Sequence, residues 1–458
     1  MHVLKSYKIK YLAFIAPFIL AFLSWLYFPV IAQWILANIF RYPVSEQAAN
    51  VFWTSAIRLF YTWYTFVAIG VAGVWILAAF FARKRKIESG YDFFPMVSFI
   101  VPAFNQEKNI GCCVASLFRC SEKYEGNCEI IVVDDGSSDF TYEAAWSAVR
   151  LGRSEQPRVR CKVMRHFVNI GKIEALKTGI NRAQGSLVAI VDADSEWLPD
   201  ILTELANYMK ANGKQAVTGY VHPKGEGSRE NLIVRLQRLE YSGGLSVGRC
   251  AQGLGNNVIV VSGALGLYDA RLLREVLGEN NIHSATEDLE MTLALHRKGA
   301  KVGYMSFVQS ATVVPKNLGL FWRQRLRWFT GWLHNTLNIH RDLMGKRSWL
   351  AILLWYSYLF EYAGAFIDLA ALAAFPFLWW LAPDPFSFGL NLLVFVPYSL
   401  LIGLVSHAIA LRFAYGSSRR YSLLFYLPLY SLLRLVNDLA RCRSIVDYLK
   451  GNNGKWHN

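Results

Sequence analysis

Two carboxylates at the end of an apolar run are the residues of this chain best suited to binding a metal ion. Asp192 and Asp194 flank one alanine directly after a strand-like run at 186–191. Mg²⁺ or Mn²⁺ accepts such oxygen ligands together with those of a diphosphate. The cation would neutralise a departing nucleotide diphosphate, so that the sugar attached to it is displaced more easily. We therefore predict Asp192 and Asp194 as metal ligands, although alone such a pair is usually a solvated loop.

Asp288 is the candidate general base, with Glu287 beside it. Both follow Thr286 at the start of a helical pattern over 287–297. The helix dipole would keep Asp288 ionised there. A carboxylate so placed can take the proton of a sugar hydroxyl as a glycosidic bond forms. A helix-capping sequence explains the same residues without any chemistry.

A basic and aromatic motif comprises Gln324, Arg325, Arg327 and Trp328, in an expected helix over 320–341. The guanidinium of Arg327 can pair with a diphosphate. The ring of Trp328 offers an apolar face to a sugar. Arginine and tryptophan also suit a helix that lies on a membrane surface, and both interpretations can hold.

Two further candidates are less specific. Asp134 and Asp135 follow an apolar run at 129–133, where a carboxylate can bind a base or a ribose. Turn chemistry alone explains them equally well. Lys172 begins a helical pattern, where it and the backbone amides could reach phosphates, but a surface lysine is an equally good interpretation.

The elements that position these residues alternate between strands and helices from residue 97 onward. This order predicts an α/β domain with a parallel sheet covered on both faces. Ligands of such sheets bind beyond the carboxyl ends of strands, which is where Asn105, Asp134 and Asp192 fall. The expected strands are 97–101, 129–133, 158–165, 186–191 and 216–220, and the expected helices 108–118, 141–151, 172–183, 200–212 and 229–241.

Long apolar segments flank this domain, and the whole chain is 54% hydrophobic. Runs of about 20 apolar residues cross a bilayer, so residues 1–86 should contain two spans, at 11–40 and 57–82. Basic residues before the first span and at 83–86 favour the cytoplasmic side, so the domain between the spans should be cytoplasmic. The expected location is the plasma membrane, with several passes. Residues 349–458 contain apolar runs at 349–382, 388–414 and 421–440 and a short basic tail. Whether 421–440 spans the membrane or lies on its surface stays open.

Composition excludes several other classes of protein. The net charge is +15, but no nucleic-acid-binding motif accompanies it, so an anionic substrate or membrane surface is the better interpretation. The seven cysteines form no CxxC pair. A zinc site or a disulfide framework is therefore not expected.

Taken in order, the motifs resemble those of the membrane-embedded family 2 glycosyltransferases, the synthases of cellulose, chitin, hyaluronan and poly-N-acetylglucosamine. The resemblance covers roughly 95–345. The matching pieces are Val101-Pro102-Ala103-Phe104-Asn105-Gln106-Glu107, Asp134-Asp135-Gly136-Ser137, Asn169-x-Gly171-Lys172, Asp192-x-Asp194, Gln237-x-x-Glu240-Tyr241, Ser262-Gly263, Thr286-Glu287-Asp288 and Gln324-Arg325-x-Arg327-Trp328.

This resemblance implies a GT-A-type, Rossmann-like cytosolic domain at 87–316, interfacial helices at 317–348, a UDP-sugar donor and inversion at the anomeric carbon. It implies that Asp134 and Asp135 hold the uridine, that Asp192 and Asp194 serve ribose and metal, and that Asp288 is the base. The other residues it places in the donor site are Pro102, Ala103, Asn105, Glu107, Lys172, Ser262, Gly263, Gln324, Arg325, Arg327 and Trp328.

Three functions follow as hypotheses. The first is a processive synthase that polymerises a β-linked polysaccharide from UDP-N-acetylglucosamine or UDP-glucose and extrudes it, with the growing chain, the bilayer and possibly an accessory subunit as partners. Carboxylates at Glu361 and Asp368 within an apolar run hint at a polar path for such a chain. The alternative is a single transfer to a lipid, as in ceramide glucosyltransferases. A non-catalytic scaffold or transporter is the third, and the intact acidic set argues against it.

Overall fold

The computed structural model describes residues 17–23, 26–27, 30–31, 34–35, 37–39, 41, 65–83, 92–226, 230–279, 282, 284–381, 385–416 and 420–451. About half of the predicted first span at 11–40 lies outside this set, and so do residues 57–64 of the second span and the basic residues 84–86. From residue 65 to 83 the chain is helical, as η1 (Phe66–Val71) and α4 (Ala72–Arg83).

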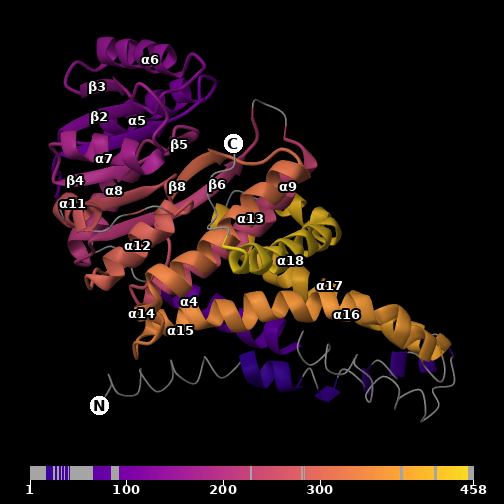
Figure 1. Ribbon diagram of the computed structural model, residues 1–458. Coiled ribbons are helices and arrows are strands. Elements are labelled where there is room, and N and C mark those ends of the chain that lie inside the picture. The colour runs from indigo at the N-terminus through magenta and orange to yellow at the C-terminus, as the bar shows by residue number, and fades with distance from the viewer. Residues whose placement is uncertain are drawn as a thin grey trace, which may run out of the picture.

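A mixed sheet of eight strands forms the centre of the domain (Figure 1). Its spatial order is β3-β2-β1-β4-β7-β6-β8-β5. The strands are β1 (Val97–Ala103), β2 (Cys128–Asp134), β3 (Arg160–Arg165), β4 (Leu187–Ile190), β5 (Ser195–Trp197), β6 (Ala216–Lys224), β7 (Gly266–Asp269) and β8 (Val302–Val313).

The expectation of a parallel sheet holds for six of the eight strands, and β5 and β7 run in the opposite direction. Strands β3, β2, β1 and β4 pair parallel with one another, and β6 pairs parallel with β8. Strand β7 pairs antiparallel with both β4 and β6, and β5 pairs antiparallel with β8. The sequence pattern did not indicate β5, β7 or β8, two of which have only three or four residues.

Helices cover both faces of the sheet, as expected. Alternate residues of β1 point to opposite faces, so Phe99 packs in one apolar core and Ile100 in the other. The first core contains side chains of α5, α6 and α8, and the second those of α7, α9, α11 and α12. The helices of the domain are α5 (Ile110–Lys123), α6 (Thr141–Glu155), α7 (Lys172–Arg182), α8 (Ile201–Ala211), α9 (Leu232–Tyr241), η2 (Ser242–Gly248), α10 (Arg249–Leu254), α11 (Ala270–Glu279) and α12 (Glu287–Arg297).

The described residues after β8 are mainly helical. Within the described part of the chain, three stretches are long and apolar enough to cross a membrane: Trp349–Ala374, Val396–Tyr415 and Tyr421–Leu449. The elements are α13 (Leu318–His334), η3 (Asn335–Ile339), α14 (Arg341–Met344), α15 (Trp349–Tyr356), η4 (Ser357–Tyr362), α16 (Ala363–Leu381), α17 (Pro385–Tyr415), η5 (Tyr421–Tyr426) and α18 (Leu427–Leu449).

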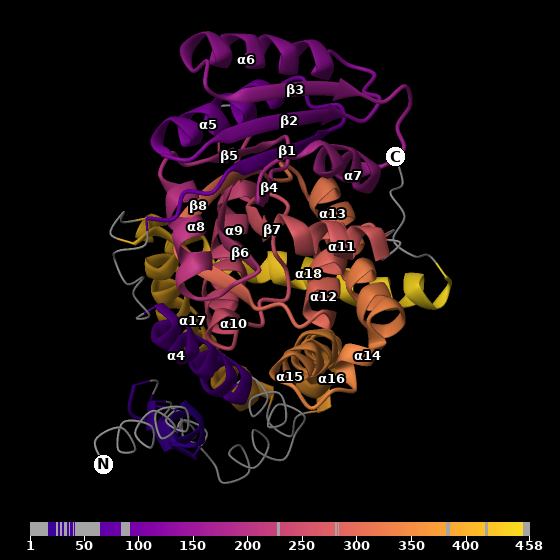
Figure 2. The ribbon, with the colours of Figure 1, turned by 90° about the vertical axis from the view of Figure 1, so that its left-hand side faces the viewer.

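Helix α18 does not follow the direction of α16. Figure 2 shows α16 nearly end-on, while α18 runs across the view. At the start of α18, the hydroxyl of Tyr426 accepts a hydrogen bond from Arg235 of α9. Near its end, Tyr448 donates one to Asn338 of η3. Both ends of α18 therefore contact helices that adjoin the sheet domain.

Candidate active site

The carboxyl ends of the parallel strands bring the predicted acidic motifs to one edge of the sheet. The backbone N–H of Asp135 donates to Ala103 O at 2.8 Å, which joins the ends of β2 and β1. The N–H of Asp192, just beyond β4, donates to Gly263 O at 2.9 Å. This edge therefore brings together segments that lie far apart in the sequence.

Lys172 joins two of these motifs. Its Nζ lies 2.6 Å from Asp192 Oδ1 and 2.6 Å from Glu287 Oε1. Burial alone would lower the pKa of this amine, but the two carboxylates outweigh it and raise that pKa above its usual value. The lysine is thus a fixed cation between β4 and the start of α12, not a solvated surface residue.

Asp194 lies beside Asp192 in a half-buried position. Burial, and secondarily the Asp192 charge, raise the pKa of Asp194 to about 6. Ser195 and Thr312 each donate a hydroxyl hydrogen bond to it, at 3.1 and 3.2 Å. Gly263 lies against the carboxylate of Asp192, so closely that a Cβ at residue 263 would be 2.9 Å from Asp192 Oδ1.

The two carboxylates fit a divalent cation that also takes ligands from its substrate. Within the described part of the chain, no group of three or more His, Cys, Asp or Glu side chains is arranged to hold a metal. Mg²⁺ is commonly bound by one or two carboxylates plus substrate phosphates, which is a donor set of this size. A cation would also stabilise the ionised form of Asp194, which burial disfavours.

Glu287 and Asp288 are adjacent and differ electrostatically, with Glu287 buried and Asp288 half-buried. Burial, and then the neighbouring Glu287 charge, raise the pKa of Asp288 to about 6. Its Oδ1 accepts the N–H of Leu289 at 2.8 Å. Burial would also raise the pKa of Glu287, but the Lys172 cation outweighs it and lowers that pKa. Glu287 is therefore held as a carboxylate, and Asp288 can exchange a proton near neutral pH.

Helix α13 packs directly on the segment that carries Asp288. Arg327 Nη1 donates to Ala285 O at 2.6 Å. At Gly331 a Cβ would lie only 2.4 Å from Thr286 Oγ1, so the helix approaches as closely as glycine permits. Asn335 Nδ2 donates to Thr286 Oγ1 at 3.0 Å. The sequence motif includes Arg327 but neither Gly331 nor Asn335.

Arg325 has a different position from the one expected of a donor-binding residue. Its side chain is 1% exposed and makes two hydrogen bonds to the Glu240 carboxylate, at 3.2 and 2.6 Å. Its guanidinium lies 4.1 Å from the ring centroid of Trp328 and 4.3 Å from that of Phe321. Gln324 accepts a third hydrogen bond from it at 2.6 Å. Arg325 therefore holds α13 to α9, with its polar groups directed into the protein.

Asp134 and Asp135 also bind protein groups. Asp134 Oδ2 lies 3.1 Å from Arg165 Nε. Asp135 Oδ1 lies 2.7 Å from His166 Nδ1, and its Oδ2 accepts the N–H of Gly171 at 2.8 Å. Asp135 thereby fixes the loop that ends at Lys172, a role that no local pattern indicated for it or for His166.

The remaining predicted residues shape the strand ends. Asn105 has a left-handed backbone (φ 52°), and its Oδ1 accepts the N–H of Ser138 at 3.0 Å. Glu107 Oε2 accepts the N–H of Phe140 at 3.1 Å. Pro102 and Ala103 are buried residues of β1, and Ser262 Oγ accepts the N–H of Ala264 at 3.3 Å. These residues position the loops around the carboxylates.

Known proteins resemble this chain in sequence and in fold. Residues 98–277 match the model of the family "Glycosyl transferase family 2". An N-acetylglucosaminyltransferase of Mesorhizobium japonicum is 28% identical over 266 residues, which are 56% of this chain and 61% of that protein. A poly-beta-1,6-N-acetyl-D-glucosamine synthase of Staphylococcus aureus is 26% identical over 288 residues, 59% of this chain and 65% of that one. The alignments thus span less than two thirds of these relatives.

A solved structure supports the same fold. The mannosyltransferase PcManGT of Pyrobaculum calidifontis, in complex with GDP-Man and Mn²⁺, covers 84% of this chain and 96% of its own, with a TM-score of 0.52 and 20% identity. At that identity the likeness concerns the fold alone. The GT-A-like architecture expected from the motifs is confirmed, and the family match over residues 98–277 agrees with the expected enzyme class.

Proposed function

Because residues 98–277 carry a family 2 glycosyltransferase domain, we propose that this protein transfers a sugar from a nucleoside diphosphate to a hydroxyl acceptor at a membrane. The observation that carries the proposal is the connection from Asp288 through Glu287 and Lys172 to the Asp192 and Asp194 pair. It unites a proton acceptor with an anion- and cation-binding edge of the sheet. The proposed donor is UDP-N-acetylglucosamine, since the relatives from M. japonicum and S. aureus bear names that contain N-acetylglucosamine.

In the proposed reaction, Asp288 accepts the proton of the acceptor hydroxyl. The hydroxyl oxygen bonds to the anomeric carbon of the donor, and the bond from that carbon to the diphosphate breaks. Attack from the side opposite the leaving group inverts the anomeric configuration. With a pKa of about 6, Asp288 is largely ionised at neutral pH yet basic enough to serve in proton transfer.

Lys172 and the aspartate pair would receive the leaving diphosphate. Asp192 and Asp194 would hold Mg²⁺ or Mn²⁺, which would neutralise the negative charge of the diphosphate. Lys172 would add a second positive charge at the same edge. Arg327, anchored to Ala285 O beside Asp288, would approach the diphosphate from α13. The contact with Glu240 leaves Arg325 a positioning role in this scheme.

The domain would face the cytoplasm, with α15–α17 in the membrane. Helix α13 would lie at the interface, where arginine and tryptophan are favoured. Contacts of both ends of α18 with α9 and η3 support a surface position for α18 as well.

Polymerisation and extrusion form the finer part of the proposal. The synthase name of the S. aureus relative supports it. The hint taken from Glu361 and Asp368 does not, because Arg441 lies 3.6 Å from Glu361 and Arg434 lies 3.4 Å from Asp368. Those carboxylates have protein partners in α18, so a polar path is not needed to explain them.

Analysis of the reaction product tests both the sugar transfer and the polymerisation. The full chain in nanodiscs would be supplied with radiolabelled UDP-N-acetylglucosamine or UDP-glucose and Mg²⁺ or Mn²⁺. A high-molecular-weight product is the expected result. A single labelled sugar on added lipid would keep the transferase and replace the polymer with a glycolipid. If the protein neither hydrolyses any of the UDP-sugars nor transfers their sugar, the proposal that it is a glycosyltransferase is refuted.

A further inference from the structure

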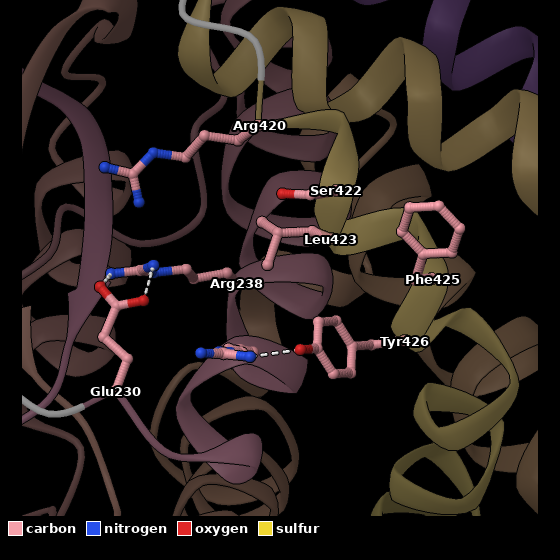
Figure 3. Close-up of a pocket in the computed structure, with 8 residues that line it drawn as sticks. Glu230, Arg238, Arg420, Ser422, Leu423, Phe425 and Tyr426 are labelled. Carbon is pink, nitrogen blue, oxygen red and sulfur yellow. Dashed lines mark hydrogen bonds and ion pairs between the residues drawn. The ribbon is translucent and has the colours of Figure 1, made fainter.

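A basic cavity lies outside the candidate active site, where α9 meets the turn between α17 and α18. Its volume is about 610 Å³. Figure 3 shows the side chains of Arg238 and Arg420 directed toward the same side of it. The cavity is lined by Glu230, Arg235, Arg238, Arg420, Ser422, Leu423, Phe425 and Tyr426.

The charges of the cavity do not balance. Its lining has three arginines and one glutamate, which leaves a net charge of +2. Glu230 pairs with Arg238, and Arg238 Nε also donates to Pro223 O at 3.1 Å. Arg235 donates to the neutral hydroxyl of Tyr426, and Arg420 lies over the Tyr415 ring at 5.2 Å. Among the described residues, the ion pairs recorded for this lining are thus confined to Arg238.

A neighbouring histidine, His222, does not add to the positive charge of the cavity. His222 of β6 is largely buried, and burial followed by the charges of Arg238 and Arg420 lowers its pKa to about 3. A neutral imidazole there adds no positive charge to the cavity. Guanidinium groups remain charged at all relevant pH values, so the cavity offers an external anion two arginines, Arg235 and Arg420, that form no ion pair with the described carboxylates.

The surroundings of the cavity select the kind of anion. It lies at η5 (Tyr421–Tyr426), where the apolar stretch Tyr421–Leu449 begins, shortly after the apolar stretch Val396–Tyr415 ends. Beside the arginines, the Phe425 side chain is 87% exposed. An exposed aromatic ring next to a basic pocket between membrane helices is typical of the bilayer interface, where basic pockets bind anionic headgroups.

We propose that this cavity binds the phosphate of an anionic phospholipid headgroup, with Arg235 and Arg420 as its direct partners and Arg238 behind them. Arginine suits this ligand because its planar fork can make two hydrogen bonds to one phosphate. Ser422 would donate a further hydrogen bond, and Phe425 would enter the acyl-chain region. This site is independent of the proposed sugar transfer.

A binding measurement on the full chain in detergent tests the proposal. Fluorescent phosphatidylglycerol would be titrated into the wild-type protein, the double variant Arg235→Gln/Arg420→Gln and the control Arg150→Gln/Arg271→Gln. The control removes the same charge from exposed positions on α6 and α11. With each basic residue worth about fivefold in affinity, the first variant should bind about 30-fold more weakly and the control like wild type.

A second variant predicts a gain, which misfolding cannot produce. Glu230→Gln removes the one negative charge of the cavity and releases Arg238, so phosphatidylglycerol should bind about fivefold more tightly. Unchanged affinity in all variants, or equal binding of phosphatidylcholine, would overturn the proposal. Displacement of the lipid by inorganic phosphate or glycerol phosphate at the same concentration would assign the cavity to a soluble phosphate compound. The proposal of a phospholipid ligand would then be wrong.

Discussion

Replacing Asp288 by Asn and Glu287 by Gln should change activity and stability in a pattern that only their different environments explain. Both substitutions keep the shape of the side chain and remove its charge. Asp288 has a pKa raised from 3.8 to about 6, whereas the pKa of Glu287 is lowered. The first charge is therefore costly in the folded protein, and the second is stabilising.

The magnitudes follow from linkage. The folded protein binds a proton at Asp288 between pH 4 and 6 that the unfolded chain does not bind, so its stability falls as the pH rises through this window. At 1.36 kcal/mol per pH unit, the ionised Asp288 costs about 3 kcal/mol above pH 6. Asp288→Asn should recover up to that amount at pH 7.5. Glu287→Gln should lose about 2 kcal/mol through its bond to Lys172, an effect that disappears as acid protonates Glu287.

Activity separates the pair further. Asp288→Asn should lower kcat by about 10²–10⁴, the usual contribution of a general base, with the KM for the donor nearly unchanged. The wild-type kcat should fall about tenfold between pH 7.5 and pH 5, because Asp288 must be ionised to accept a proton. Transfer assays across this pH range, together with unfolding monitored by tryptophan fluorescence, measure all of these quantities. An active Asn variant, a flat pH profile, or stability changes of the same sign in both variants would refute the reasoning.

Three further outcomes are expected. EDTA should abolish turnover of the full chain, and Mg²⁺ or Mn²⁺ should restore it; undiminished activity in EDTA would remove the metal role from Asp192 and Asp194. Gly331→Ala should destabilise the protein by about 1–3 kcal/mol and slow transfer, because the new methyl would meet Thr286 Oγ1 at 2.4 Å. Its control, Gly319→Ala on the same helix, meets its nearest neighbour at 3.6 Å and should be neutral in both assays. Arg325→Ala should cost about 3–5 kcal/mol of stability by leaving Glu240 without its buried partner, and a stable variant would contradict the ion pair.

Local patterns were sufficient to predict where the acidic residues lie. Strands β1, β2 and β4 are short apolar runs that end at polar residues, and α12 begins at Glu287, as its sequence predicts. Because parallel strands end at one edge, the grouping of Asn105, Asp134 and Asp192 followed from strand order alone. The ends of these strands and of α12 depend on residues that are neighbours in the sequence, so one amino-acid sequence is enough to predict them.

Local sequence patterns could not predict the contacts between segments that lie far apart in the chain. Lys172 meets Glu287 of a helix far along the chain, so nothing near either residue distinguishes Lys172 from a surface lysine. Arg325 lies in a motif whose residues could bind a substrate, yet its charge is paired with that of Glu240, 85 residues away. Asn437 of α18 donates to the same carboxylate at 2.8 Å. Strand β5, with three residues, exists because it pairs with β8 and not because of its own propensity.

Helix α18 is the case in which the structure removes a conflict that the sequence left open. If residues 421–440 crossed the membrane, the basic tail would lie on the side that the charge rule disfavours. Its polar residues at helical spacing instead contact the protein: Arg434 lies near Asp368, Asn437 binds Glu240, and Arg441 lies near Glu361. Apolar side chains remain exposed elsewhere on the helix, namely those of Leu429, Leu432, Leu439 and Val446. Of these partners, Glu240 belongs to α9 of the sheet domain, whereas Asp368 and Glu361 belong to α16 and η4. A helix with a polar face on protein and apolar side chains left uncovered is suited to lie along a bilayer surface. We therefore infer that α18 does so, which leaves the basic tail on the same side as the sheet domain and satisfies the charge rule.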